Sequence, residues 1–161
     1  MEQEIASAIK FIIEASGDSA PYYWEMPQDF LVPAVYFPPP EIESFGHTFN
    51  DYALSFSWFV KFFHKDAALA HEACLSVLNA IKERRCYIPL IDAEGRRTKR
   101  SFRMNDPRMR NLDGGATQLT LMWDVPRAYF AEPRKKIERF ELNIRARGAF
   151  DSAVNQINEG D

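Results

Sequence analysis

The chain is built around Thr48–Arg85, which reads TFNDYALSFSWFVKFFHKDAALAHEACLSVLNAIKERR. In the first half of this segment, every even position from Tyr52 to Phe62 is apolar, and most odd positions are small or polar. A period of two residues is typical of a strand that buries one face. The alternation extends over more residues than the five or six of an ordinary strand, so it predicts one unusually long strand.

Two aromatic residues interrupt this alternation. Phe59 and Phe63 occupy odd positions, so they place large apolar side chains on the face that should contact water. Exposed apolar area of this kind indicates a contact surface. We expect the two rings to be covered, either by another element of the same chain or by another subunit.

A helix is predicted to follow directly, over Asp66–Arg85. The Asp66 carboxylate can accept hydrogen bonds from the free amide groups of the first turn. Apolar residues then recur at helical spacing, and the basic residues Lys82, Arg84 and Arg85 suit the negative end of the helix dipole. A long strand that leads into one helix across a sheet is typical of an α+β domain.

The length of 161 residues favours a single domain over 1–161, in which 126–161 could form a C-terminal extension. The sequence contains neither an apolar run of about 18 residues nor an apparent leader, so we expect a protein used inside the cell, with no membrane partner. Its two cysteines, Cys74 and Cys86, suggest neither a disulfide framework nor paired metal ligands. We expect both to be core residues.

The net charge of −3 conceals an uneven distribution. Residues 1–95 carry 6 basic and 14 acidic side chains, whereas residues 96–147 carry 14 basic and 6 acidic ones. Such a division is typical of proteins that bind nucleic acid or a complementary protein surface, including a neighbouring subunit. An alternative interpretation is that both sets are solvated and mixed in space.

The remaining elements are predicted from shorter patterns. We expect an N-terminal helix over residues 2–16, with an apolar stripe through Ile5, Ile9, Ile12 and Ser16 that is widened by Ile13, ending at Gly17. The other predicted strands are Pro21–Met26, Leu31–Phe37 starting at Pro33 or lying at an edge, Tyr87–Ile91, Arg96–Met104, Thr117–Val125 and Arg134–Arg147. In the last of these, Ile137, Phe140 and Ile144 also fit a helix, and the strand is the interpretation chosen.

Two polar segments are predicted as loops. Glu41–Ser44 is interpreted as an acidic loop, and Asn105–Gly115 as a loop that is mobile or ordered only by a partner. A short closing helix is expected through Phe150, Val154 and Ile157. Together these elements predict an α+β fold: a mixed, mostly antiparallel sheet with a central crossover helix on one face and short terminal helices.

The sharpest candidate for catalysis combines His64, Asp66, His71 and Glu72, since histidines and carboxylates can hold a divalent metal. Their spacing fits no zinc motif, and a capped helix start with surface histidines explains them more simply. The sequence also contains no Gly-x-Ser-x-Gly elbow and no phosphate-binding glycine loop. We therefore expect no catalytic, cofactor-binding or metal-binding residues.

The basic run Arg96–Arg103 remains as a candidate contact region. It could follow a phosphate backbone or press against a protein partner, and no helix suited to the DNA major groove accompanies it. Aromatic residues, which make up 14% of the chain, are enriched at protein interfaces. The residues expected at a subunit or tube interface are Phe59, Phe63, Arg97, Arg100, Arg103, Arg108 and Arg110.

In the order of its elements, the chain resembles phage tail terminator proteins. The segments that carry this resemblance are VPAVYF at Val32–Phe37, the long strand continued by Ala70-His71-Glu72 and Val77-Leu78, YIPL at Tyr87–Leu90, and TQLTLMW at Thr117–Trp123. The resemblance covers residues 5–125. It leaves the role of residues 127–161 open.

This resemblance implies a structural virion protein. Such proteins form a ring, usually of six subunits, that caps the tail tube, stops its polymerisation and offers a docking face to the neck. Related headless, phage-tail-like particles use the same kind of ring as an end cap. The implied partners are other copies of the chain and the tube, sheath and neck proteins, with DNA only as passing cargo.

The resemblance implies neither catalysis nor a cofactor, and it places the protein in the host cytoplasm and then in the virion or tail-like particle. Two alternatives remain. The protein could be another neck or tail-completion protein, or it could be a small enzyme or ligand-binding module with a site at the sheet edge. Polar groups clustered in one deep pocket would favour the enzyme, whereas a flat aromatic rim would favour the ring.

Overall fold

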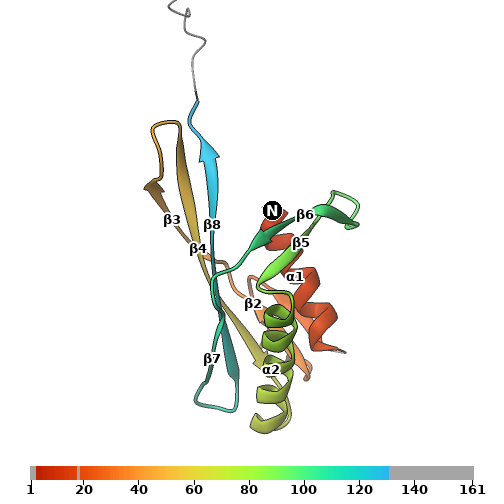
Figure 1. The fold of residues 1–161 in the computed structure, drawn as a ribbon. Coiled ribbons are helices and arrows are strands. Elements are labelled where there is room, and N and C mark those ends of the chain that lie inside the picture. Colours follow the sequence, from red (N-terminus) through yellow and green to blue (C-terminus); the bar gives the residue numbers. More distant parts are fainter. Residues whose placement is uncertain (1–2, 18, 131–161) are drawn as a thin grey trace, which may run out of the picture. The chain divides into compact units, whose positions relative to one another are not determined.

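The computed structural model describes residues 3–17 and 19–130, and the elements named here lie within one compact unit, Met1–Tyr129. The described residues of this unit form two helices and eight strands, and Figure 1 shows how they are arranged. In chain order they are α1 Gln3–Ser16, β1 Ala20–Tyr23, β2 Ala34–Phe37, β3 Glu41–Gly46, β4 Asp51–Phe63, α2 Ala67–Glu83, β5 Tyr87–Ile91, β6 Arg97–Arg103, β7 Arg108–Asn111 and β8 Thr117–Ala128.

Six strands form one sheet in the order β1-β2-β4-β8-β7, and β3 pairs with β4 beside this path. The β1–β2 pair is parallel, and the other described pairs of this sheet are antiparallel. The strands β5 and β6 form a separate antiparallel hairpin. The predicted α+β class, with a mixed and mostly antiparallel sheet, is confirmed.

The central pair β4–β8 carries the core. Its ladder runs from the pair Asp51–Ala128 to the pair Phe62–Thr117, so nearly the whole length of β4 is paired. From Phe56 to Phe62 the even positions of β4 are fully buried, as the alternation predicted. On β8 the buried side chains opposite them include Leu119, Leu121 and Trp123. Alternate residues of both strands therefore build one continuous apolar layer.

The helix α2 packs on this apolar layer through Cys74, Val77 and Ile81, all fully buried. Asp66 caps its first turn, because its Oδ1 accepts a hydrogen bond from the amide of Ala68 at 3.4 Å. Figure 1 shows α1 beside α2, on the same side of the β4–β8 pair. The crossover helix is thus confirmed, and it lies on one face of the sheet.

The buried face of α1 differs from the predicted one. The helix buries Glu4, Ala8 and Phe11 together with Ile9 and Ile12, whereas Ile5 and Ile13 are only half-buried. The stripe is rotated because α1 packs against both α2 and β5, so two neighbours determine which side is covered. Gly17, with φ +73°, follows the helix as predicted for a C-terminal stop.

Both predicted loops contain strands, and these two interpretations were wrong. The acidic segment belongs to β3, which pairs with β4 from Glu41–Ser57 to Gly46–Tyr52. The segment 105–115 contains β7, which pairs with β8, and its two glycines form the turn between these strands. In both cases a strand with mostly exposed, polar side chains is held by its backbone bonds to a buried neighbour.

The hairpin β5–β6 was predicted correctly, and its turn contains Gly95 at φ +76°. The strand expected at Arg134–Arg147 and the closing helix through Phe150, Val154 and Ile157 lie outside the described residues. Neither of the described helices is long and apolar enough to cross a membrane.

Candidate interaction surface

The two faces of the large sheet differ in chemistry. The helices cover the face that carries Phe56 and Trp58, and the odd positions of β4 point to the opposite side. We call this opposite side of β3, β4, β7 and β8 the open face. Most of its side chains along the middle of β4 and β8, including Ser57, Phe59 and Thr120, remain partly exposed. The open face is therefore an accessible surface at the centre of the sheet.

Three of the seven predicted interface residues meet on the open face. Phe59 lies opposite Thr120 of β8, which in turn lies opposite Arg108 of β7. Phe59, Arg108 and Arg110 line an open pocket of about 340 Å³ together with Met109, Gln118 and Thr120. The Arg110 guanidinium donates to Gln118 Oε1 at 3.4 Å. The structure thus joins an apolar ring to two exposed guanidinium groups.

Phe63 is partly covered by its own chain. Its ring contacts that of Phe30 edge-to-face with centroids 5.0 Å apart, and Phe30 contacts Tyr22 at 6.2 Å. This small aromatic cluster lies at the β1–β2 side of the sheet. Another element of the same chain therefore covers part of Phe63, which remains half-buried.

The other three predicted residues lie on β6, in the second sheet. Arg97 forms an ion pair with Glu14 of α1. Arg103 places its guanidinium 6.0 Å from the ring centroid of Tyr87. Arg100 is exposed. The structure therefore does not join these arginines to those of β7 in one strand ladder.

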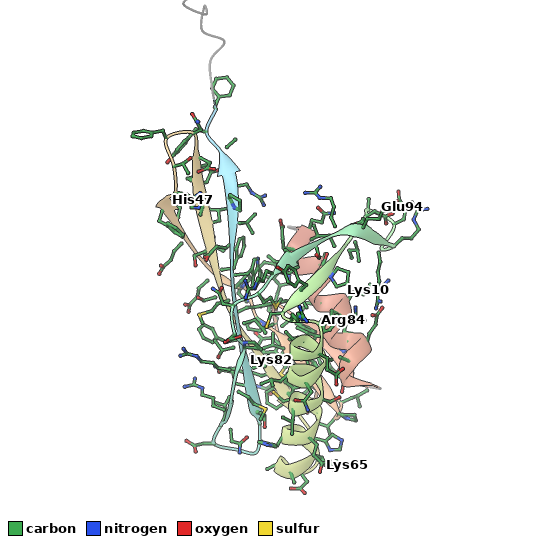
Figure 2. The ribbon with its side chains drawn as sticks, in the orientation of Figure 1. Lys10, His47, Lys65, Lys82, Arg84 and Glu94 are labelled. Carbon is green, nitrogen blue, oxygen red and sulfur yellow. The ribbon has the colours of Figure 1, made fainter. Side chains whose placement is uncertain are left out.

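Polar contacts attach the β5–β6 hairpin to α1. Lys10 Nζ donates to the Gly95 carbonyl at 2.7 Å, and the Ile91 amide donates to Ser7 Oγ at 3.0 Å. Figure 2 shows Lys10 and Glu94 near this hairpin. Arg97 belongs to the same set of contacts through Glu14. At least one residue of the basic run therefore has a role inside the chain.

Charge on the open face is separated along the strands. The basic residues Lys61, Arg108 and Arg110 lie beside the part of β8 that pairs with β7. Glu41, Glu43 and Asp124 lie about four residues further along, at the level of the β3 ladder. Sequence reasoning missed the acidic group because it assigned Glu41–Ser44 to a loop. Only the β3–β4 register shows that both glutamates share a face with the arginines.

Apolar side chains are exposed at the far end of β3, β4 and β8. Phe45, Phe49 and Tyr129 at this end are all at least two-fifths exposed, and so is Ile42 nearer the middle of β4, opposite Phe56. Tyr52 packs against Tyr129 with ring centroids 5.3 Å apart, beside an open pocket of about 330 Å³. Exposed aromatic groups of this kind are enriched at protein contact surfaces.

The turn at this end is held by Asp51. Its Oδ1 accepts from the Thr48 hydroxyl at 2.6 Å and lies 3.0 Å from His47 Nδ1. The hydrogen bond from Thr48, with a smaller contribution from His47, lowers the pKa of Asp51. Figure 2 places His47 at this end of the sheet.

Three of the four residues considered for a metal site have other partners. Asp66 caps α2, and His64 Nδ1 accepts from the amide of Lys65 at 2.9 Å. His71 Nδ1 lies 3.0 Å from Asn111 Oδ1 on β7. Within residues 3–17 and 19–130, no three His, Cys, Asp or Glu side chains are grouped as metal ligands.

Both cysteines are free and buried, as predicted for core residues. Burial raises the pKa of Cys74 to about 12. Cys86 Sγ lies 3.8 Å from Asp106 Oδ1, which also accepts from Lys82 Nζ at 2.8 Å. This hydrogen bond from Lys82 lowers the pKa of Asp106.

Comparison with known proteins gives two similar chains from Bacillus subtilis (strain 168). Over 142 residues the chain is 30% identical to YqbJ, a protein described as uncharacterized, covering 88% of this chain and 97% of YqbJ. Over 144 residues it is 28% identical to the phage-like element PBSX protein XkdJ, covering 89% of this chain and 97% of XkdJ. No protein-family model matches the chain. At this identity and coverage the chain belongs to the same family as YqbJ, and its homologues include a protein of a phage-like element.

Proposed function

We propose that this protein is a structural component of a phage or phage-like particle, and that it acts as the tail terminator. In this role, copies of the chain form a ring, of six subunits by the resemblance, that caps the tail tube and ends its polymerisation. The observation that carries the proposal is the match to the PBSX protein XkdJ, which spans 97% of that protein. The order of elements that suggested the tail terminator family supports the finer assignment.

The surface chemistry of the chain suits such a role. A ring subunit needs two different contact areas for its neighbours and a third for the tube or neck. The open face carries separated basic and acidic groups, and the far end of the sheet exposes Phe45, Phe49 and Tyr129. The pockets at these places are open and lie among surface side chains. The proposed role requires no catalysis and no cofactor.

The proposed partners are the tube and sheath proteins on one side of the ring and the neck proteins on the other. The protein would assemble in the host cytoplasm and remain in the finished particle. Charged rims steer the encounter of subunits and fix their alignment, while apolar contacts provide most of the adhesion. A chain that is monomeric when dilute and closes into a ring only on a tube end is compatible with this role.

Electron microscopy of particles assembled without the protein tests the proposal. We expect tail tubes of irregular length or with bare ends, and normal tubes when the wild-type gene is restored. Tubes of normal length that lack only a head or neck component would contradict the terminator role and would favour a neck-completion protein. An unchanged particle would contradict both structural roles.

A further inference from the structure

Among residues 3–17 and 19–130, β7 and β3 each have one unpaired edge, and their sequences are complementary. β7 contains Arg108-Met109-Arg110, and its one partner in this part of the chain is β8. β3 begins Glu41-Ile42-Glu43, and its one partner there is β4. We call β7 the basic edge and β3 the acidic edge. An unpaired edge presents free backbone donors and acceptors, so it is a template for another strand.

The charged side chains of both edges lie on the same face of the sheet. Arg108 and Arg110 lie opposite Thr120 and Gln118 of β8. Those two residues lie opposite Phe59 and Lys61 of β4. Glu41 and Glu43 lie opposite Ser57 and Ser55 of the same strand. All of these positions of β4 are odd, so both edges direct their charges to the open face.

The two edges cannot meet within one chain, because β4 and β8 lie between them. We propose that the acidic edge of one copy pairs with the basic edge of a second copy, which continues the sheet from subunit to subunit. This inference rests on the proposed ring-forming function and specifies its contact. A contact between two different edges is heterologous, so it generates a closed ring or an open helical assembly.

Strand direction determines how the edges align. β7 and β3 run in opposite directions in one chain, because β7 is antiparallel to β8, β8 to β4, and β4 to β3. A continuous sheet that keeps its faces aligned would therefore pair the edges in antiparallel fashion. In this direction, the register that brings Arg110 opposite Glu41 also brings Arg108 opposite Glu43, so each charge meets its opposite.

The middle residues of the two edges also match. In the same alignment, Met109 lies opposite Ile42, on the face that bears the helices. Ile42 is 51% exposed in the single chain, while Met109 is partly buried against the core. Pairing would bury the exposed part of Ile42 against Met109, which extends the apolar layer into the neighbouring copy.

The stagger of the two edges is compatible with closure. Arg110 is aligned with Lys61 of β4 through Gln118, and Glu41 is aligned with Ser57 of β4. When Arg110 of one copy pairs with Glu41 of the next, Lys61 of the first copy is aligned with Ser57 of the second. Each contact therefore shifts the next copy by four residues along β4. Each copy contributes the four strands β3, β4, β8 and β7 to the continued sheet. With strands about 4.8 Å apart and a rise of about 3.3 Å per residue, this shift gives a strand tilt of roughly 35°. Closed sheets have tilts of about 35–45°.

Charge reversal on purified chains tests the contact. The variant Arg108→Glu/Arg110→Glu has two acidic edges, and Glu41→Arg/Glu43→Arg has two basic edges. We expect each alone to self-associate at least about tenfold more weakly than wild type in sedimentation velocity at low salt. An equimolar mixture should regain assembly, because acidic-edged and basic-edged copies can alternate. Native mass spectrometry should then show only even numbers of subunits.

A matched control separates edge pairing from general charge effects. Lys65→Glu/Lys99→Glu makes the same change in net charge on exposed residues that belong to neither edge. We expect this variant to associate like wild type. An equal loss in this control, or a mixture that fails to regain assembly, would overturn the edge pairing. Circular dichroism melting of each variant should match wild type, which shows that the subunit itself is folded.

Thiol cross-linking provides an independent readout if wild-type association is weak. A chain with Arg110→Cys mixed with a chain with Glu41→Cys should form a covalent dimer with a short bifunctional thiol reagent, since directly opposite Cβ atoms lie about 4.5–5.5 Å apart. Lys99→Cys mixed with Glu41→Cys is the control, and we expect little dimer from it. Equal yields from both mixtures would overturn the proposed contact. The tube phenotype described above would then still test the terminator role.

Discussion

The rings of Phe56 and Trp123 are nearly parallel, with an interplanar angle of 2° and centroids 4.9 Å apart. The two residues are direct partners in the β4–β8 ladder, and both are fully buried. Trp58 meets the same indole edge-on at 6.1 Å. Three large rings from two strands therefore form the centre of the core, where aromatic pairs add to the stability gained by burial.

Truncation of Trp58 should test the importance of this aromatic centre. We expect Trp58→Ala to lower the free energy of unfolding by about 3–5 kcal/mol, because a large cavity replaces a packed ring. Trp24→Ala, which removes the same side chain where it is 60% exposed, should cost less than about 1 kcal/mol. Urea titration measures both. Similar losses for the two variants would show that Trp58 is not a core residue.

The two buried tryptophans should differ when only the indole nitrogen is lost. Trp58 Nε1 donates to the Pro38 carbonyl at 2.6 Å, whereas Trp123 Nε1 has no hydrogen-bond partner among the described residues. Trp58→Phe would leave the Pro38 carbonyl unpaired, while Trp123→Phe would remove an unpaired donor. We expect Trp58→Phe to be the more destabilising by about 1 kcal/mol or more in the same titration. The opposite order would contradict this assignment.

Acid should destabilise the protein partly through Asp92. Hydrogen bonds from the Arg96 backbone, then from the Arg96 side chain and Glu94, lower the pKa of Asp92. The Asp92 carboxyl therefore binds a proton less tightly in the folded state than in the unfolded state. Its contribution to the free energy of unfolding is complete above the ordinary Asp pKa of about 3.9. That contribution is lost as the pH falls through the lower pKa of Asp92 in the folded state.

We expect Asp92→Asn to show a smaller drop in Tm than wild type between neutral pH and acid below the ordinary Asp pKa. The control is Asp29→Asn, because Asp29 forms no ion pair or hydrogen bond with another described residue. Differential scanning calorimetry at a series of pH values gives the comparison. An equal drop in all three proteins would remove Asp92 from the explanation.

The Cys74 thiol should be unreactive in the folded protein. Burial raises its pKa to about 12, so almost no thiolate forms at mildly alkaline pH, and the sulfur is also inaccessible. We expect mass spectrometry after iodoacetamide treatment to find Cys74 unlabelled in native protein and fully labelled in denaturant. The raised pKa also means that the unfolded state loses this proton first, so stability should decline as pH rises above about 8.5. Rapid native labelling would contradict the burial.

Local patterns in the sequence were sufficient for β4 and α2. The strand has a period of two over many residues, and the helix has both a capping Asp66 and a regular apolar face, so each is specified by its own residues. The strands β3 and β7 have no such signal. All six residues of β3 are exposed, and its strand conformation depends on its partner β4.

The candidate surface could be predicted only in part, for the same reason. The sequence predicted contact roles for Phe59, Arg108 and Arg110, but their proximity depends on the ladder through Thr120. It gave no sign that Glu41 and Glu43 share a face with these arginines. It also could not show that Arg97 is paired with Glu14 of α1, because that contact joins segments far apart in the chain.

The long β4–β8 ladder also has a consequence for the newly made chain on the ribosome. Each β4 residue from Asp51 to Phe62 has its partner on β8 between 55 and 77 positions later. At about 5–20 residues per second, β4 is synthesised about 3–15 s before the strand that completes its core. β3 is already present and can cover one edge of β4, and α2 follows directly behind it. The other edge of an aromatic-rich strand must wait for β8, so a slow or stalled ribosome would leave it open to aggregation.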